Sequence, residues 1–340
     1  MSHASHVTPG VVPDGTLRIA SRRITDGATM VVRDPWSGTE LGRVVLADEA
    51  HAQEAITASV LAFQRTRAQP SYERRAVLSR VAAAIEGQAD AFAELIAREA
   101  GKPITQARAE VARAVCTFQL GAEEATRMGG EAMPLDITAS SRGYSGTWVR
   151  VPAGPVIAIA PFNFPLNLVA HKLAPALASG CSVVLKPPPQ APLTSLRLAE
   201  CIRQAGAPDD AVQVVPCDVP VAEKLVRDDR FATLSFTGSA GVGWHLKSVA
   251  GRKRVLLELG GNAAVLVHDD APLEWATGRV ISGAFGYAGQ VCIKVQRLYV
   301  HRSIAAAFVA RIVERTRALE PLSPLDPTAL CGPMIDEGNA

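Results

Sequence analysis

The chain has 340 residues, of which 48% are hydrophobic, 20% charged and 5% aromatic, and 35 Lys and Arg against 33 Asp and Glu leave a net charge of +2. This composition is typical of a folded globular protein and excludes global disorder. The length suffices for two domains, because single hydrophobic cores stop growing near about 250–300 residues. The near-neutral charge, without a long run of Lys and Arg, disfavours a nucleic-acid partner and favours a small substrate.

The chain shows no targeting or membrane signal. No stretch of about 18 apolar residues is free of charges and of Pro or Gly breaks, so no membrane span is predicted. Residues 1–20 lack a basic start followed by an apolar run, and we expect a disordered lead-in there. The cysteines lie far apart, with no CxxC pair and no His-rich metal spacing, which predicts reduced thiols in a cytoplasmic protein and no metal site. They are Cys116, Cys181, Cys201, Cys217, Cys292 and Cys331.

The first predicted elements are helical. Residues 48–128 are rich in Ala, Glu, Arg and Leu, and their apolar residues recur at helical spacing, which predicts three amphipathic helices. The breaks fall at Gln69-Pro70 and around Gly101-Lys102-Pro103, where a helix stop is expected. Residues 143–151 alternate and carry β-formers, which predicts a strand that projects from the body.

After Gly154 the pattern changes to short apolar runs that alternate with helical segments. The runs are PVIAIA, SVVLK, VQVVP, ATLSF and VLLEL. The helical segments are 166–178, 192–205, 219–227 and 239–249. Continuously apolar strands separated by helices predict an α/β fold with a parallel, Rossmann-like sheet covered on both faces. Ligands of such sheets bind at the carboxyl ends of the strands. From Asn262 on, the strands AAVLV and RLYVH and helices over 273–287 and 304–319 predict the start of a second α/β unit.

Four segments place a reactive or polar residue in a turn at a strand end. They are PFNFP (161–165), KPPPQAP (186–192), FTGSAGVG (236–243), and ELGGN (258–262) with GQVCI (289–293). Taken singly, Asn163 fits a turn residue and Lys186 a solvated lysine. Ser239 fits a plain helix cap as well as a phosphate cradle, and Cys292 fits a small buried residue. Glu258 is different, because a carboxylate within an apolar strand is costly without a function.

Together, in this order, the segments resemble the aldehyde dehydrogenase superfamily over about residues 24–336. The interval of 34 residues from Glu258 to Cys292 is the one that the family shows. The resemblance implies a dinucleotide-binding domain over 21–261, with N-terminal helices at 48–128, a bridging strand region at about 131–151 and a Rossmann-like core at 152–261. It implies an incomplete, C-terminally truncated catalytic domain over 262–340.

The resemblance also implies roles for four residues. Cys292 is expected to attack an aldehyde carbonyl as a thiolate, giving a thiohemiacetal and then a thioester. The side-chain amide of Asn163 and the backbone N–H of Cys292 are expected to form the oxyanion hole. Glu258 matches the base that activates the hydrolytic water, and Lys172 matches a lysine that supports this network.

For the cofactor, the resemblance implies a dinucleotide site at the strand ends. The residues matched to it are Ile159, Ala160, Pro161, Phe162, Lys186, Pro189, Phe236, Gly238, Ser239, Val242 and Leu259. Lys186 is expected at the adenosine ribose, and Gly238 and Ser239 at the pyrophosphate. Many NAD-preferring members carry a Glu where this chain has Pro189, and without that charge a 2′-phosphate is not repelled. The expected cofactor is therefore NAD or NADP.

The resemblance implies a small aldehyde substrate and, for the family, a homodimer or homotetramer, with pairing in doubt for a truncated chain. Asn167, Val169, Val291 and Ile293 are expected to line a mainly apolar approach to Cys292. The segment 293–297 resembles relatives that act on short hydroxy- or anionic aldehydes. Two alternatives stay open: a CoA-acylating aldehyde dehydrogenase, disfavoured by Glu258, and a truncated, non-catalytic dinucleotide-binding protein.

Overall fold

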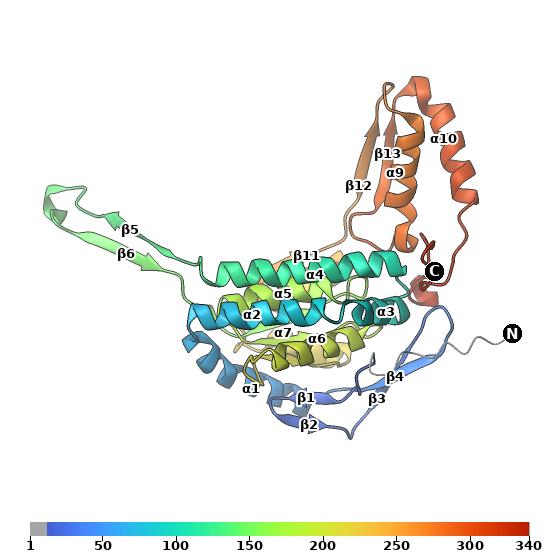
Figure 1. Ribbon diagram of the computed structural model, residues 1–340. Coiled ribbons are helices and arrows are strands. Elements are labelled where there is room, and N and C mark those ends of the chain that lie inside the picture. The colour runs from blue at the N-terminus through green and yellow to red at the C-terminus, as the bar shows by residue number, and fades with distance from the viewer. Residues whose placement is uncertain (1–11, 340) are drawn as a thin grey trace.

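The structure is a computed structural model that describes residues 12–339 (Figure 1). Its centre is a five-stranded sheet with the order β11-β10-β7-β8-β9, in which every neighbouring pair is parallel. The strands are β7 (Val156–Ile159), β8 (Val183–Lys186), β9 (Val212–Val214), β10 (Thr233–Thr237) and β11 (Arg254–Glu258). The predicted parallel sheet is confirmed.

Side chains of the central strands alternate between two apolar cores. Val156 and Ala158 belong to one core and Ile157, between them, to the other. The first core is covered by α2 (Ser71–Glu86), α3 (Ala89–Ala100), α4 (Ile104–Ala125), α5 (Asn167–Ala178) and α6 (Pro192–Gln204). The second is covered by α1 (Glu49–Ala68), α7 (Val219–Arg227) and α8 (Ala240–Val249). Burial on both faces explains why these strands are apolar throughout.

The N-terminal helical region differs from the prediction in one respect: four helices replace three. The expected breaks at Gln69-Pro70 and Gly101-Pro103 are present, and a further break separates α2 from α3 at Gly87 and Gln88. Gly87 keeps a right-handed helical conformation (φ −65°), so the chain turns without a left-handed residue. The apolar spacing continues across this break, which is why the sequence pattern did not reveal it.

Four short strands precede α1 and were not predicted. They are β1 (Leu17–Ile19), β2 (Arg22–Ile24), β3 (Thr29–Arg33) and β4 (Glu40–Val45), paired as two antiparallel hairpins. The expectation of a disordered lead-in over 1–20 is wrong for β1, whose Leu17 and Ile19 are buried. Residues 1–11 of that segment lie outside the described residues. These strands are too short for the alternation of apolar and polar residues to be recognised in the sequence.

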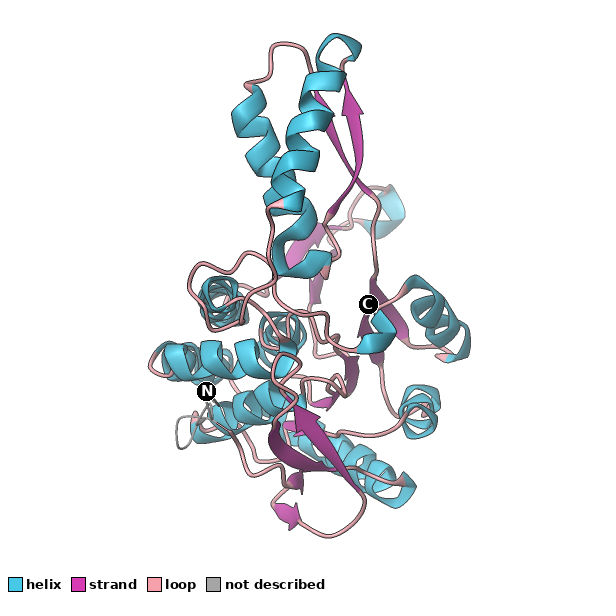
Figure 2. Cartoon of the chain, turned by 90° about the vertical axis from the view of Figure 1, so that its right-hand side faces the viewer, coloured by secondary structure: helices cyan, strands magenta, loops and turns pink. Residues whose placement is uncertain are grey.

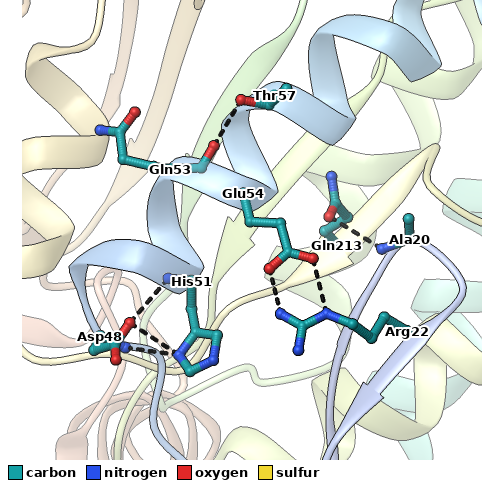
Figure 3. A network of polar contacts seen from close by, with 8 residues as sticks. All are labelled: Ala20, Arg22, Asp48, His51, Gln53, Glu54, Thr57 and Gln213. Carbon is teal, nitrogen blue, oxygen red and sulfur yellow. Dashed lines mark hydrogen bonds and ion pairs between the residues drawn. The ribbon is translucent and has the colours of Figure 1, made fainter.

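Polar contacts tie the first hairpin to α1 and to the central sheet (Figure 3). Arg22 pairs with Glu54 on α1. The side chain of Gln213 on β9 accepts from the Ala20 amide at 3.4 Å and donates to the Ala55 carbonyl at 2.9 Å. Gln213 is buried, so these bonds satisfy its amide, whereas Arg22 and Glu54 pair at the surface.

A hairpin arm projects from the body (Figure 1). It consists of β5 (Gly130–Pro134) and β6 (Ser145–Val149), paired antiparallel. The strand expected within 143–151 is therefore present and projects as predicted, with β5 as its partner. The arm exposes large apolar side chains, among them Trp148 (40%) and Val149 (68%).

A second α/β unit follows the central sheet and stands beside it (Figure 2). It contains β12 (Ala263–Val267), α9 (Leu273–Phe285), β13 (Val295–Val300) and α10 (Arg302–Arg317), with the two strands parallel. Its small core includes Val267, Val280 and Phe308, whereas Leu266 on the other side of β12 is 81% exposed. Among the described residues, no helix combines the length and apolar character that a membrane crossing requires.

Candidate functional site

Three turns at strand ends and one loop enclose a cavity of about 410 Å³. The loops that follow β7, β10 and β11 supply three of its walls, as expected for a parallel sheet. The loop between α9 and β13 supplies the fourth. The predicted residues that line it are Pro161, Phe162, Asn163, Gly238, Ser239, Glu258, Leu259, Val291 and Cys292.

Cys292 lies exposed at the cavity in the loop that follows α9. Just before it, Tyr287, Ala288 and Gly289 all adopt left-handed conformations, with φ of 53°, 53° and 69°. A left-handed backbone costs about 1–3 kcal/mol at a residue other than Gly, so the surroundings must hold this turn in place. Tyr287 is fully buried, and its hydroxyl donates to the Ala100 carbonyl at 2.7 Å.

Gln290 fixes the same loop on two sides. Its side-chain amide donates to the carbonyls of Tyr287 and Pro333, both at 3.3 Å. Its side-chain oxygen accepts from the Ile335 amide at 3.0 Å. The position of the thiol loop therefore depends on the segment around residues 333–335.

Asn163 lies in the turn after β7, and its side-chain nitrogen donates to the carbonyl of Gln290 at 2.8 Å. Because a carbonyl accepts only from a donor, this bond sets which end of the amide is nitrogen. The second hydrogen of that nitrogen is not used by this bond. The side-chain oxygen of Asn163 is buried and has no hydrogen-bond partner within residues 12–339.

Glu258 is the last residue of β11, and its side chain is exposed at the cavity. Its backbone carbonyl accepts from the Gly238 amide at 3.0 Å, which joins the ends of β10 and β11. Three residues later, a Cβ at Gly261 would lie 3.2 Å from the Cys292 carbonyl oxygen. The loops that carry the carboxylate and the thiol thus lie against each other.

Lys172, on α5, is buried beneath β10. Its ammonium donates to the hydroxyls of Ser235 at 3.2 Å and Thr237 at 2.8 Å. Burial lowers the pKa of Lys172 to about 7, and the charge of Glu258 acts in the opposite direction. Both protonation states of this lysine are therefore accessible at neutral pH, next to the cavity wall at Thr237.

His171, the neighbour of Lys172, was not predicted. Burial lowers its pKa, the charges of Arg113 and Lys172 lower it further, and Glu258 raises it. Arg113, on α4, is exposed, and its guanidinium carbon lies 5.7 Å from the centroid of the Phe164 ring. Neither residue belongs to a sequence motif, so only the fold brings these charges together.

The N-terminus of α8 is open to solvent beside the cavity. Ser239 precedes the helix, and no side-chain hydrogen bond caps it. The first amides of a helix lack partners within the helix and attract anions. A Cβ at Gly238 would lie 2.6 Å from the Phe236 ring, so this tight turn onto the helix requires glycine. The turn therefore fits the pyrophosphate of a dinucleotide.

The remaining residues predicted for a cofactor do not line the cavity. Ile159 and Ala160 end β7 and continue into its turn, and Phe236 is buried on β10. Lys186 ends β8, and burial lowers its pKa against the opposing effect of Cys217. Pro189, in the next turn, and Val242, on α8, are exposed. Together these positions lie along the carboxyl ends of the sheet strands and on α8.

The predicted approach to the thiol is partly wrong. Asn167 and Val169 are buried at 1% and 0%, and Leu168, between them, lines the cavity instead. The Asn167 side chain accepts from the Thr117 hydroxyl at 3.2 Å. Ile293 is 79% exposed and does not line the cavity. The lining residues that were not predicted are Leu168, Thr237, Gly260, Ala288, Gly289, Gln290, Lys294, Met334 and Asn339.

Comparison with known proteins identifies the family of the chain. Residues 23–340 match the Aldehyde dehydrogenase family. A 3-sulfolactaldehyde dehydrogenase of Priestia aryabhattai is 41% identical over 312 residues, covering 92% of this chain and 65% of the relative. The chain therefore spans somewhat less than two thirds of that relative's length.

Two solved structures superimpose closely. Aldehyde dehydrogenase 21 from Physcomitrella patens, in complex with the reaction product succinate, has a TM-score of 0.91 and 39% identity, with 95% of this chain and 68% of that chain covered. NADP-dependent glyceraldehyde-3-phosphate dehydrogenase from Bacillus halodurans C-125, complexed with NADP, has a TM-score of 0.91 and 33% identity, with 96% and 69% covered. The chain belongs to the aldehyde dehydrogenase family.

Proposed function

We propose that this protein oxidises an aldehyde to a carboxylic acid with NAD or NADP, through a thioester on Cys292. The observation that carries the proposal is that Cys292, Asn163 and Glu258, from three separate segments, line one cavity at the strand ends. A nucleophile, an oxyanion donor and a base around one cavity match the requirements of acyl transfer. Bound NAD(P)+ supplies the hydride acceptor.

Cys292 forms the bond to the substrate. Its thiolate attacks the aldehyde carbon, and the carbonyl oxygen becomes an oxyanion. The free N–H of the Asn163 side chain and the backbone N–H of Cys292 stabilise that charge. The bond from Asn163 to the Gln290 carbonyl supports this role, since it holds the amide nitrogen toward the thiol loop.

Glu258 acts after the thioester has formed. Its exposed carboxylate removes a proton from the water that attacks the thioester carbonyl, and the sulfur leaves as the acid departs. Lys172 lies within electrostatic range of Glu258 and is held by Ser235 and Thr237. We assign to Lys172 the electrostatic stabilisation of the Glu258 carboxylate, and we assign it no bond to the substrate.

The cofactor fits along the strand ends. The uncapped start of α8 receives the pyrophosphate, with Gly238 and Ser239 at the turn and Val242 and Phe236 on either side. Lys186 reaches the adenosine ribose, while Ile159 to Phe162 and Leu259 flank the dinucleotide. Pro189 leaves room for a 2′-phosphate, which fits either NAD or NADP. In this assignment residues 21–261 bind the dinucleotide, and residues 262–340 contribute the thiol as part of a catalytic domain.

An aldehyde with an anionic tail is the substrate class that the site supports best. Lys294 lines the cavity, and Arg113 is exposed over Phe164 beside Asn163. Neither cation forms an ion pair within the described part of the chain, residues 12–339. Of the relatives above, one is named for 3-sulfolactaldehyde and one for glyceraldehyde-3-phosphate, and the third is in complex with the reaction product succinate. All three compounds are anionic.

The proposal extends to the cellular compartment of the protein and to its oligomeric state. The six cysteines are all free thiols, which supports a reducing compartment such as the cytoplasm. The exposed apolar residues of the β5–β6 arm, such as Val149, support pairing into a homodimer or homotetramer through that arm.

The test is NAD(P)H formation with succinate semialdehyde, with Cys292→Ala as the variant and Cys116→Ala as the matched control at another exposed cysteine. The proposal predicts turnover in the wild type and in the control and none in Cys292→Ala. Turnover that survives in Cys292→Ala refutes the assignment of the nucleophile.

A further inference from the structure

Lys102 lies in the turn between α3 and α4 and is among the most deeply buried charged groups, with 1% of the residue exposed. Its ammonium forms an ion pair with the carboxylate of Glu110, which is also 1% exposed. A buried ion pair adds little net stability over apolar residues of the same volume. The contacts of this pair are therefore better explained by what they hold in place.

The pair contacts the loop that carries Asn163. The Lys102 ammonium lies 3.5 Å from the centroid of the Phe164 ring. The second oxygen of Glu110 accepts from the amides of Leu166 at 2.9 Å and Asn167 at 3.0 Å, where α5 begins. The backbone is thus fixed directly after Asn163, on both sides of Pro165.

The same ammonium contacts the loop that carries Cys292. It lies 4.9 Å from the centroid of the Tyr287 ring. The Tyr287 carbonyl accepts from the Gln290 amide at 3.0 Å. The Gln290 carbonyl in turn accepts from the Asn163 side chain at 2.8 Å. Lys102 therefore closes a ring of contacts that passes through both loops.

We propose that Lys102 is a positioning residue that sets the Asn163 amide at the right distance and angle from the thiol of Cys292. The inference rests on the proposed function, in which these two groups act on one carbonyl. A cation between two aromatic rings holds both rings by their faces, and Phe164 and Tyr287 belong to different loops. A donor in an oxyanion hole acts only where it meets the developing charge, so a small displacement weakens it.

The test measures thiohemiacetal formation, which needs the two loops but no cofactor. The sulfur–carbon bond forms as the carbonyl π bond opens, and the thiol proton ends on the oxygen. Succinate semialdehyde bound in this way protects Cys292 from iodoacetamide, and mass spectrometry of the Cys292 peptide reports the rate. The exposed Cys116 in the same chain serves as an internal reference for the reagent.

Two variants remove the proposed contact, and a third is a matched control at another buried lysine. Lys102→Met removes the charge, and Phe164→Leu removes one ring while leaving the ion pair in place. Lys253→Met removes another buried lysine, which donates to the Ala250 carbonyl at 3.1 Å and does not line the cavity. If Lys102→Met does not fold, Phe164→Leu still decides the question.

We expect the aldehyde concentration that half-protects Cys292 to rise about tenfold in Lys102→Met and in Phe164→Leu. This is less than the roughly 100-fold effect of removing an oxyanion donor, because the variants displace the donor and do not remove it. Lys253→Met should match the wild type, and alkylation without aldehyde should be alike in all four proteins. During turnover the two variants should lower kcat and leave the KM for the cofactor unchanged.

Equal protection in Phe164→Leu and the wild type overturns the inference, and so does an equal loss in Lys253→Met. If the aldehyde does not protect the wild-type thiol at all, the proposed function fails, and the positioning role falls with it.

Discussion

The side-chain amide of Asn163 and the backbone carbonyl of Gln290 are 127 residues apart in sequence and share a hydrogen bond of 2.8 Å. This bond joins the turn after β7 to the loop of Cys292. It explains how one cavity is built from segments that come from the central sheet and from the second α/β unit. It also fixes the orientation of the amide that we assign to the oxyanion hole.

Asn163→Ala should therefore lower kcat about 100- to 1,000-fold, because the donor stabilises the charge on the carbonyl oxygen in the transition state. Asn163→Asp keeps the size of the side chain and loses the donor, so it should resemble Asn163→Ala. Steady-state kinetics on both variants check this. A rise in KM at unchanged kcat would show that Asn163 only binds the substrate.

Glu258→Gln should form NAD(P)H in a burst of about one equivalent per site and then stop, because the thioester forms but no base activates water. Hydroxylamine attacks thioesters without a protein base, so adding it should restore turnover. Stopped-flow absorbance of NAD(P)H measures both the size of the burst and the turnover restored by hydroxylamine. Steady turnover of Glu258→Gln without hydroxylamine would remove Glu258 from the role of base.

Lys172 should make stability depend on pH. The pKa of Lys172 is about 7 in the folded protein, whereas the usual pKa of a lysine side chain exposed to water is 10.5. Between these values the unfolded chain binds a proton that the folded chain lacks, so the free energy of unfolding rises with pH across this window and is insensitive to Lys172 below it. Relative to Lys172→Met, the wild type should gain on the order of a few kcal/mol from pH 7 to pH 10.

Urea unfolding of both proteins at several pH values measures this difference. Parallel curves for the wild type and Lys172→Met would show that the folded protein does not depress the pKa of Lys172.

Pro189→Glu should change the choice of cofactor. A carboxylate at this exposed turn, three residues after Lys186, repels a 2′-phosphate and accepts hydrogen bonds from ribose hydroxyls. We expect the Kd of NADP to rise about tenfold or more and that of NAD to stay level or fall. Pro189→Gln is the neutral control. An equal change for both cofactors in titrations by intrinsic fluorescence would place the ribose elsewhere.

The sequence predicted the central sheet well, because strands buried on both faces are apolar throughout and are separated by helices of ordinary length. It did not predict β1 to β4, since three to six residues with Arg and Glu among them show no clear period. It also missed the break at Gly87, where the backbone remains right-handed and the apolar spacing continues into the next helix.

For the site, the order and spacing of the motifs singled out Asn163, Glu258 and Cys292, which line one cavity. The helix after PFNFP was predicted in the wrong phase, since Asn167 and Val169 face the interior and Leu168 faces the cavity. The left-handed turn at Tyr287 and Ala288 had no sequence signal, because neither residue is Gly or Asn. The contacts of Lys102 with residues 164 and 287 depend on the fold alone.

The most direct test of the mechanism is to mix the protein with succinate semialdehyde and NAD(P)+, quench it in acid within milliseconds and examine the cysteine peptides by mass spectrometry. The mechanism predicts the mass of the acyl thioester on the Cys292 peptide, only when aldehyde and cofactor are both present, and none on the other five cysteines. NAD(P)H formation without an acyl group on Cys292, or an acyl group on another cysteine, would contradict it.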